Sequence, residues 1–468
     1  MRPRELPIPT RMSRVAIVVP ETRLREALAE VADAGSVELV GNPPAPEGEA
    51  LEALRRLERR GSADGQVVPR LSPAARDVSE LERAGRRDLL AGEVELERRA
   101  ETAVRHGRFT ALVGWTPAGE LERLDGRLAR VGAAAVELPK PAWVEPPTLL
   151  QDGRVTRTFR PLVETYGPLR YTDVDPTPFA ALAFVLMFGM MFGDVGHGAL
   201  LALLGLGLQR ARRGRLSPFQ HLWPFPVAAG LVAAGFGLLY GEAFGPTGLV
   251  PTVWLKPTDR PITLLAAATA VGAVLLSVSY ALGTLNRWRQ GGGLSALLAP
   301  SGIAGFLVFL GGGLAAGGWY EASLALEGTG GVLAVAGALL LGTGFLMGAG
   351  RGATAVTEAT VEVIDAVIRV VANVISFTRL AAFGLMHAAL AEVVFDATRA
   401  IWGGAAGSAL AVIVFVVGNA LAFSLEVLVA GVQALRLEYY ELFSRIFAGQ
   451  GHRFLPWHIP FDPTKEEA

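Results

Sequence analysis

The chain has 468 residues, a formal net charge of -1 and no cysteine, and hydrophobic residues make up 51% of it. The balanced charge argues against a nucleic-acid partner, and the lack of cysteine excludes disulfides, thiol catalysis and thiolate metal sites. Up to about Arg170 the sequence is rich in arginine and glutamate, whereas apolar runs dominate beyond it. We therefore expect a soluble domain over residues 1–170 and a polytopic membrane domain over residues 171–468, ending in a short cytoplasmic C-terminus.

The soluble part begins with a strand and a helix. Residues 14–19 read RVAIVV, a short β-branched run that stops at Pro20 and indicates a buried strand. Residues 21–34 carry leucine and valine at helical spacing, and Gly35 ends this helix. Residues 36–40 indicate a second strand. Because the N-terminus lacks the apolar core of a signal peptide, we expect this α+β domain in the cytoplasm.

A helical arm follows. From residue 46 to about residue 105 the sequence is dense in charge, with leucines at helical spacing on both sides of the loop GSADGQVVPRLSP at residues 61–73. This pattern predicts a short helical hairpin. Residues 109–115 then indicate another strand and residues 117–131 another helix. We expect two α/β lobes separated by the arm, although the residues fit a generic α/β domain equally well.

The second part predicts a mainly α-helical membrane domain with about eight transmembrane helices. Each apolar stretch approaches the roughly 20 residues that cross a bilayer as a helix. The first two stretches are short and are separated only by a turn at Gly193 and Asp194, so reading them as one helix would give seven. The stretches are residues 177–193, 195–209, 223–243, 262–285, 296–318, 330–349, 363–395 and 408–435.

Loop charges favour eight spans. If the N-terminus is cytoplasmic, eight spans put three arginine-bearing loops on the cytoplasmic side. This agrees with the rule that positive charge is enriched in cytoplasmic loops. Seven spans would fit the first two of these loops only if the N-terminus were outside. The arginines of the expected cytoplasmic loops are Arg210, Arg212, Arg213, Arg215, Arg287, Arg289 and Arg351, and the opposite loops hold Lys256, Arg260 and Arg399 beside several acidic residues.

Two arginines stand out in the last two stretches. Arg379 lies near the middle of residues 363–395, and Arg436 ends the apolar run of residues 408–435. A charge at mid-bilayer costs at least about 2.5 kcal/mol, so such a residue faces protein or water and is a functional candidate. The alternatives are a structural ion pair for Arg379 and an interfacial side chain that reaches to the headgroups for Arg436.

Other polar residues on these two helices are arranged on either side of the arginines. At 1.5 Å per residue, Asp365 lies roughly 21 Å to the cytoplasmic side of Arg379 and His387 roughly 12 Å to the far side. Glu426 lies roughly 15 Å to the far side of Arg436, and Gln433 sits one turn from Arg436.

These positions describe two half-length polar tracks separated by fixed positive charge. Such tracks serve proton transfer if a carboxylate on another chain moves between them, because histidine and carboxylates can shuttle protons while arginine stays charged. Packing roles for His387 and Glu426, and an ion pair of Asp365 with Arg369, remain open. Asp194, His197 and Glu242 either line the outer access to the path or act as cap and loop residues.

Four segments carry a family resemblance. SFTRLAAFGLMHAAL at residues 376–390 and VQALRLEYYELFSRIF at residues 432–447 resemble the last two membrane helices of subunit a of rotary V-type and A-type ATPases, called subunit I in archaea and bacteria. FGMMFGDVGHGALL at residues 188–201 and the segment at residues 145–179 match the same family. The membrane part matches in order along its length, whereas the N-terminal part is shorter than the family usually shows.

The resemblance implies a stator membrane subunit of a V/A-type rotary ATPase or ATP synthase. It would provide two proton half-channels, with Arg379 and Arg436 as the barrier facing rotor carboxylates. The implied partners are a ring of small membrane rotor subunits, peripheral stalk subunits and, indirectly, the central stalk and ATPase head. The implied location is the cell membrane, multi-pass, with both termini cytoplasmic.

No cofactor or metal is expected, because the sequence has neither a phosphate-binding Gly-Lys-Ser/Thr loop nor an HExxH cluster. Partner subunits would therefore hold any ATP site. The alternatives from other classes are a secondary transporter in which Arg379 binds an anion and a membrane scaffold. The ion, H+ or Na+, and the direction, pumping or synthesis, stay open.

Overall fold

The computed structural model describes the chain apart from residues 1–8, 42, 61–66, 142, 151–152, 212–216, 350–351, 448–450 and 463–468. The chain divides into two compact units. One is formed by residues 9–151 together with residues 451–468, and the other by residues 152–450. The sequence suggested a boundary near residue 170, with the C-terminal residues in the membrane domain. Arg212, Arg213, Arg215 and Arg351, used above to argue topology, lie outside the described residues.

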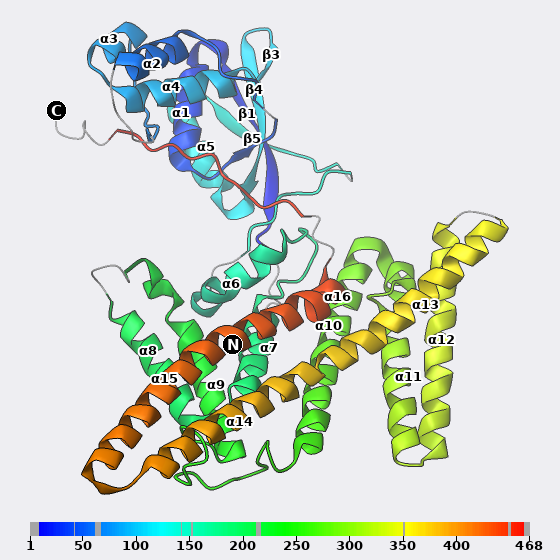
Figure 1. Cartoon of the computed structure of the whole chain (residues 1–468). Coiled ribbons are helices and arrows are strands. Elements are labelled where there is room, and N and C mark those ends of the chain that lie inside the picture. Colours follow the sequence, from blue (N-terminus) through cyan, green and yellow to red (C-terminus); the bar gives the residue numbers. More distant parts are fainter. Residues whose placement is uncertain are drawn as a thin grey trace. The chain divides into compact units, whose positions relative to one another are not determined.

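The first unit is built on one five-stranded sheet (Figure 1). Its order is β2 (Glu38–Leu39), β4 (Phe109–Pro117), β1 (Met12–Pro20) and β5 (Ala134–Leu138), and β3 (Val104–His106) also pairs with β4. The two nine-residue strands β1 and β4 pair antiparallel along their whole length, from Met12 opposite Pro117 to Pro20 opposite Phe109. The expectation of two separate lobes is therefore wrong, because the strands assigned to each lobe form one sheet.

Helices α1 (Leu24–Ala34) and α5 (Leu121–Arg130) contribute leucines to the core of this sheet. The charged segment predicted as an arm forms α2 (Glu49–Arg60), α3 (Val78–Arg83) and α4 (Arg87–Ala100). A second small core, made of Ala53, Leu81, Leu89 and Leu90, holds these three helices together. Residues 61–66 lie outside the described part, so the turn of the predicted hairpin is not described.

The C-terminal segment is part of the first unit. Trp457 and Ile459 are buried in its core together with residues of β1 and α1. The backbone N–H of Trp457 donates to the carbonyl of Val37 at 2.8 Å, and that of Ile459 donates to Ala32 at 3.1 Å. Main-chain hydrogen bonds thus fix a segment that carries no regular secondary structure.

Replacing Trp457 by alanine should destabilise the first unit by about 3–5 kcal/mol, because a buried aromatic side chain leaves a cavity when it is truncated. Hydrogen exchange at the amides of β1 in the full chain measures this loss. Leu455→Ala is the matched control, since Leu455 lies on the same segment but is 61% exposed, and we expect it to change stability by less than about 0.5 kcal/mol. Equal protection in the two variants would contradict the packing role of the segment.

The second unit begins with α6 (Arg154–Tyr166) and three closely packed helices, α7 (Thr177–Met191), α8 (Val195–Gln209) and α9 (Pro224–Tyr240). Glycines permit the close approach that the sequence suggested. A Cβ added at Gly198 would lie 2.5 Å from the backbone nitrogen of Ala234, and one added at Gly189 would lie 2.6 Å from Val232. Larger residues at these positions would separate the helices.

Helices α10 (Pro261–Leu298), α11 (Ile303–Tyr320) and α12 (Leu324–Gly348) follow, and α11 packs against α12. Among the described residues, five helices are long and apolar enough to cross a membrane, whereas α7 and α8 are shorter. The five are Phe219–Tyr240, Pro261–Leu298, Ile303–Tyr320, Leu324–Gly348 and Gly404–Ile446. The fold is therefore mainly helical and contains several apolar spans, as the composition predicted.

The last part of the unit consists of α13 (Ala353–Ser376), α14 (Thr378–Ile401) and α15 (Gly404–Leu437), followed by a π-helical turn (Glu438–Phe443) and α16 (Ser444–Ile446). The apolar run predicted as one span at residues 363–395 is divided at Phe377. The Phe377 side chain is fully buried, and a Cβ added at Gly272 of α10 would lie 2.2 Å from its Cγ. The Phe377 ring, directly before α14, thus occupies the space beside Gly272 that a larger side chain would fill. Helix α14 packs against α15, α10 and α7 (Figure 1).

Candidate functional site

Five of the residues singled out in the sequence meet in one place, which we call the buried cluster. Asp194 and His197 lie at the start of α8, and Glu242 follows the end of α9. His387 comes from α14 and Glu426 from α15. The exposed fractions are 0% for Asp194, 1% for His197, 3% for His387, 5% for Glu426 and 7% for Glu242. Residues expected on the outer half-track and at the outer access therefore form a single site.

His387 and Glu426 are direct partners. The His387 Nδ1 atom is hydrogen-bonded to Glu426 Oε2, which joins α14 to α15 at this level. The other ring nitrogen, Nε2, lies 3.9 Å from Glu242 Oε2. The His387 ring also contacts the rings of Phe192 and His197. The imidazole therefore stands between two carboxylates inside an aromatic surround.

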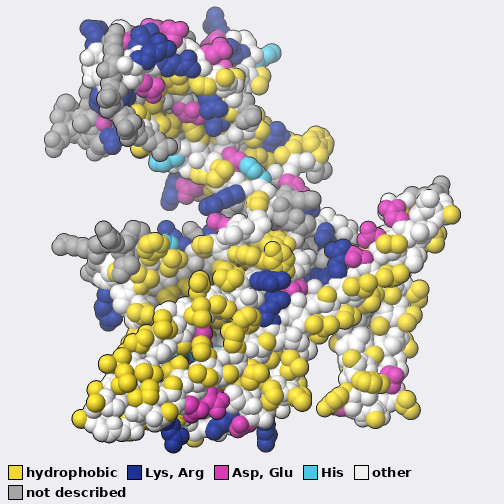
Figure 2. Space-filling model, in the orientation of Figure 1, with side chains coloured by type: hydrophobic (Ala, Val, Ile, Leu, Met, Phe, Trp, Pro, Cys, Tyr) yellow, Lys and Arg dark blue, Asp and Glu magenta, His cyan; other side chains and the backbone are white. Residues whose placement is uncertain are grey.

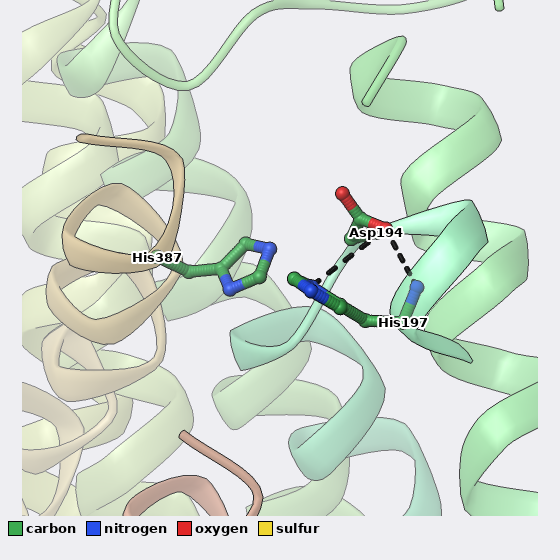
Figure 3. A group of neighbouring side chains, drawn as sticks. All are labelled: Asp194, His197 and His387. Atoms are coloured by element: carbon green, nitrogen blue, oxygen red, sulfur yellow. Dashed lines mark hydrogen bonds and ion pairs between the residues drawn. The ribbon is translucent and has the colours of Figure 1, made fainter. Parts of the chain in front are cut away.

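Asp194 acts as a cap and also belongs to the cluster. Its Oδ1 accepts hydrogen bonds from the backbone N–H of His197 at 2.8 Å and of Phe244 at 3.0 Å, and Oδ2 accepts one from Gly245 at 2.9 Å. The capping bond fixes the start of α8, as aspartate commonly does at helix N-termini. The same carboxylate lies 3.8 Å from His197 Nδ1 (Figure 3). The two alternatives for Asp194, cap and polar-path residue, are thus compatible.

Several polar atoms of the buried cluster have no hydrogen-bond partner among the described residues. They are both ring nitrogens of His197, Nε2 of His387, Oε2 of Glu242 and Oε1 of Glu426. A buried polar atom left without any partner costs about 1–3 kcal/mol. Groups of this kind are suited to take up protons, water or an ion.

The two arginines differ in their surroundings. Arg379 is half-buried at the start of α14, and its Nη1 atom has no hydrogen-bond partner in the described part of the chain. Arg436, at the end of α15, is exposed. Arg436 and Glu441 are the charged neighbours that act most strongly on Arg379. Because no described carboxylate lies within ion-pair distance of Arg379, the structural ion-pair alternative has no support here.

The remaining predicted residues are less closely connected to the site. Gln433 is half-buried one turn before Arg436, and its Oε1 has no partner among the described residues. Asp365 is paired with Arg369, whose Nε donates to Asp365 Oδ2 at 2.6 Å. This is the alternative that the sequence left open for Asp365, and its place in a proton path stays a prediction.

The π-helical turn after Arg436 adds two carboxylates that the sequence analysis missed. Glu438 is completely buried, and neither carboxylate oxygen has a partner among the described residues. Glu441 is buried as well. Its Oε2 lies 2.8 Å from the amide nitrogen of Asn373, whose oxygen in turn accepts from Arg445 at 2.8 Å. π-Turns of this kind are frequent at functional sites, and the signal in the sequence was the pair of glutamates directly after an intramembrane arginine.

Together these residues form two polar groups on opposite sides of Arg379. The buried cluster lies roughly 12 Å along α14 in one direction. Glu438, Glu441 and Asn373 lie near the opposite end of the helix pair. Arg379 lies between the two groups along the helices, and Arg436 lies two residues before Glu438.

Comparisons with known proteins match different parts of the chain. The V-type ATPase 116kDa subunit family matches residues 102–216. The A-type ATP synthase subunit I of Pyrococcus horikoshii is 28% identical over 397 residues, which cover 79% of this chain and 57% of that protein. The corresponding protein of Halobacterium salinarum is 29% identical over 388 residues, covering 69% and 53%.

A bacterial protein gives a similar result. The V-type ATP synthase subunit I 2 of Treponema pallidum is 33% identical over 288 residues, which cover 56% of this chain and 59% of that protein. The chain thus spans somewhat more than half the length of the curated relatives it matches. The resemblance inferred from the four segments is confirmed, and the chain is related to the subunit I proteins of A-type and V-type ATP synthases.

Proposed function

We propose that the chain is the stator membrane subunit of a V/A-type rotary ATPase or ATP synthase. It provides two proton half-channels and an arginine barrier against a rotating ring of small membrane subunits. The observation that carries the proposal is Arg379, which lies between two separate groups of polar residues and whose Nη1 atom has no hydrogen-bond partner among the described residues. Relatives named as subunit I of such enzymes support it.

The surface around the arginines suits a membrane partner. Hydrophobic side chains cover the face that α14 and α15 present in Figure 2. Arg436 is exposed at the end of α15. A small membrane subunit with one carboxylate would find an apolar surface along α15 and a positive charge at its end. The exposed apolar residues of α15 include Ile413, Val416, Leu421, Leu425, Leu428 and Val432.

The chemistry of the barrier follows from charge. A rotor carboxylate that approaches Arg379 is favoured in its ionised form, because a nearby opposite charge stabilises it, and it therefore releases its proton. Away from the arginine, in lipid, the same carboxylate must be protonated, since a bare charge there is costly. Protons would reach the ring through the buried cluster on one side. Glu438, Glu441 and Asp365 would serve on the other side.

An even number of membrane crossings is part of this proposal. Strand β1 and the C-terminal segment around Trp457 belong to the same folded unit. A chain that leaves a domain, enters a membrane and returns to the same domain must cross an even number of times. The five long apolar helices, the short helices α7 and α8, and α13 with α14 as one span give eight. Both termini would then lie in the cytoplasm.

Cysteine labelling tests the topology. The native chain has no cysteine, so single substitutions at Ala75, Ser217 and Ala405 can be compared directly. Ala75 and Ala405 are exposed and Ser217 is partly exposed. In intact cells, an impermeant thiol reagent should label only Ala405→Cys, at the start of α15. Labelling of Ala75→Cys or Ser217→Cys from outside would contradict the eight-span topology.

Purification of the native complex tests the function. A ring of small carboxylate-bearing membrane subunits and a soluble ATPase head should accompany this chain, and peripheral stalk subunits should bind its first unit. A chain that purifies alone, yet transports an anion in vesicles, would indicate a secondary transporter. Association with other proteins but without a rotor ring would indicate a scaffold.

A further inference from the structure

Three members of the buried cluster form a group of metal-ligand type. Asp194, His197 and His387 each offer one ligand atom, and these atoms all lie within 4.8 Å of one another. Figure 3 shows the two imidazoles and the carboxylate turned toward one space between α8 and α14. All three side chains are more than nine-tenths buried. The ligands come from two distant parts of the chain, because Asp194 and His197 lie at the start of α8 while His387 comes from α14.

The protonation of His387 favours coordination. In the tautomer in which His387 Nδ1 donates the shared proton to the Glu426 carboxylate, Nε2 carries no proton. The Nε2 atom then has a free lone pair, and no described residue donates to it. A histidine ligand whose second nitrogen donates to a carboxylate is the usual arrangement in zinc sites, where the carboxylate fixes the tautomer and raises the basicity of the ring.

His197 and Asp194 also have lone pairs that can bind a metal ion. Both ring nitrogens of His197 lack a partner among the described residues, so either one is free to coordinate. Asp194 Oδ2 accepts one hydrogen bond, from Gly245, and a carboxylate oxygen has a second lone pair to give. Glu242 Oε2 lies 3.9 Å from His387 Nε2 and has no hydrogen-bond partner among the described residues, but it is not one of the three grouped ligand atoms.

We propose that Asp194, His197 and His387 form a binding site for a divalent transition-metal ion of the Zn²⁺ class. Two imidazoles and one carboxylate suit Zn²⁺, whose ligands lie about 2.0–2.2 Å from the metal and which takes water as a further ligand in open sites. Mg²⁺ and Ca²⁺ prefer oxygen ligands and are disfavoured by the imidazoles. The positive ion would also compensate the carboxylates gathered in a buried place.

The site has a consequence that rests on the proposed function. The atoms that would hold the metal are the same atoms that would carry protons through the outer half-channel. A bound ion occupies the lone pairs of His197 and His387, so these rings are unable to accept protons. Zn²⁺ would therefore act as an inhibitor of proton flow that competes with protons for one site.

Cobalt provides a direct measurement of binding. Co²⁺ added to the purified complex should give the visible absorption bands of a site with nitrogen and oxygen ligands, and Zn²⁺ should displace it while Mg²⁺ should not. His197→Ala should weaken Co²⁺ binding at least about tenfold, since even the loss of a residue that supports a ligand costs 10–100-fold. His106→Ala, at an exposed histidine of the first unit, is the control and should bind like the wild type. Equal binding by His197→Ala and the wild type would overturn the proposal.

A second variant avoids dependence on a loss of signal. His197→Cys introduces the only thiol of the chain at a ligand position. Co²⁺ bound at this site should then show thiolate-to-cobalt charge-transfer absorption. At the same metal concentration, neither the wild type nor the control His106→Cys should show this absorption. An assembled His197→Cys complex that binds Co²⁺ without this absorption would place the metal elsewhere and reject the site.

Proton flux separates the site from the function. In reconstituted vesicles, Zn²⁺ should slow proton flow at the concentrations at which it displaces Co²⁺. Binding without inhibition would keep the metal site and contradict a half-channel at the buried cluster. Flux without any binding of Co²⁺ or Zn²⁺ would reject the metal site and leave the proposed function intact.

Discussion

Replacing Arg379 by alanine should abolish coupled proton transport and allow a passive proton leak through the assembled complex. In the proposed function, the arginine is the charged group that attracts the rotor carboxylate and separates the two polar groups. Two unit charges about 4 Å apart interact by about 4 kcal/mol at an effective dielectric constant of 20, which corresponds to roughly a thousandfold in rate. Vesicles with a pH-sensitive dye measure coupled transport with ATP present and leak without it.

Conservative variants sharpen this test. Arg379→Lys keeps a positive charge but loses the planar guanidinium, and lysine shifts its pKa readily in apolar surroundings, so we expect this variant to be inactive as well. Arg436→Lys is the matched control and should be milder, because Arg436 is exposed at the end of α15. Near wild-type pumping by Arg379→Lys complexes would remove the barrier role and leave Arg379 with a structural one.

Replacing Glu426 by glutamine should slow proton flow by at least about tenfold while the complex still assembles. Glutamine has nearly the same shape but takes no charge, and it leaves His387 without the carboxylate that accepts from its Nδ1 atom. Removing a group that transfers a proton typically lowers the rate 10²–10⁴-fold. Because water can fill the space and carry some of the protons, we take about tenfold as the smallest expected loss of proton flow. His387→Ala should have a smaller effect, because water can replace an imidazole.

The control for this prediction is Glu358→Gln. Glu358 is an exposed glutamate on α13, away from the buried cluster, so its substitution should leave the flux unchanged. Proton flux at wild-type level in assembled Glu426→Gln complexes would assign Glu426 to helix packing.

Local features of the fold were predictable and pairings between distant segments were not. The β-branching of residues 14–19 predicted β1, and the apolar runs predicted α7 to α9 closely. Helix α10 extends 13 residues beyond its predicted end at residue 285, and α11 begins at Ile303 instead of residue 296. The single sheet was missed because β1 pairs with β4, and nothing local in either strand specifies its partner. Strand β3 has three exposed residues, which leave no hydrophobic pattern to read.

The C-terminal segment illustrates a second limit. Residues 454–461 contain two prolines and no regular period, so they read as a tail. Their position depends on main-chain hydrogen bonds to Ala32, Val37 and Leu71, and such bonds have no sequence signature.

The candidate site was predictable along each helix but not between helices. Ionisable residues within apolar runs identified Arg379, Arg436, His387 and Glu426. Placing such a residue in a membrane is costly, so its presence indicates a function. That Asp194, His197 and Glu242 would meet His387 depends on how α8 and α9 pack against α14. Glu438 and Glu441 were missed since the π-helical turn changes the spacing on which a helical reading relies.

The contact between Phe377 and Gly272 bears on how such a machine would withstand torque. A ring that turns past a fixed charge pulls that charge sideways at every step, and a barrier that yielded by a few ångströms would open a leak. Arg379 lies two residues from a fully buried ring that is seated in α10. In the proposed machine, this contact with a second helix would carry the load on Arg379, so the break between α13 and α14 would hold the arginine in place rather than act as a hinge.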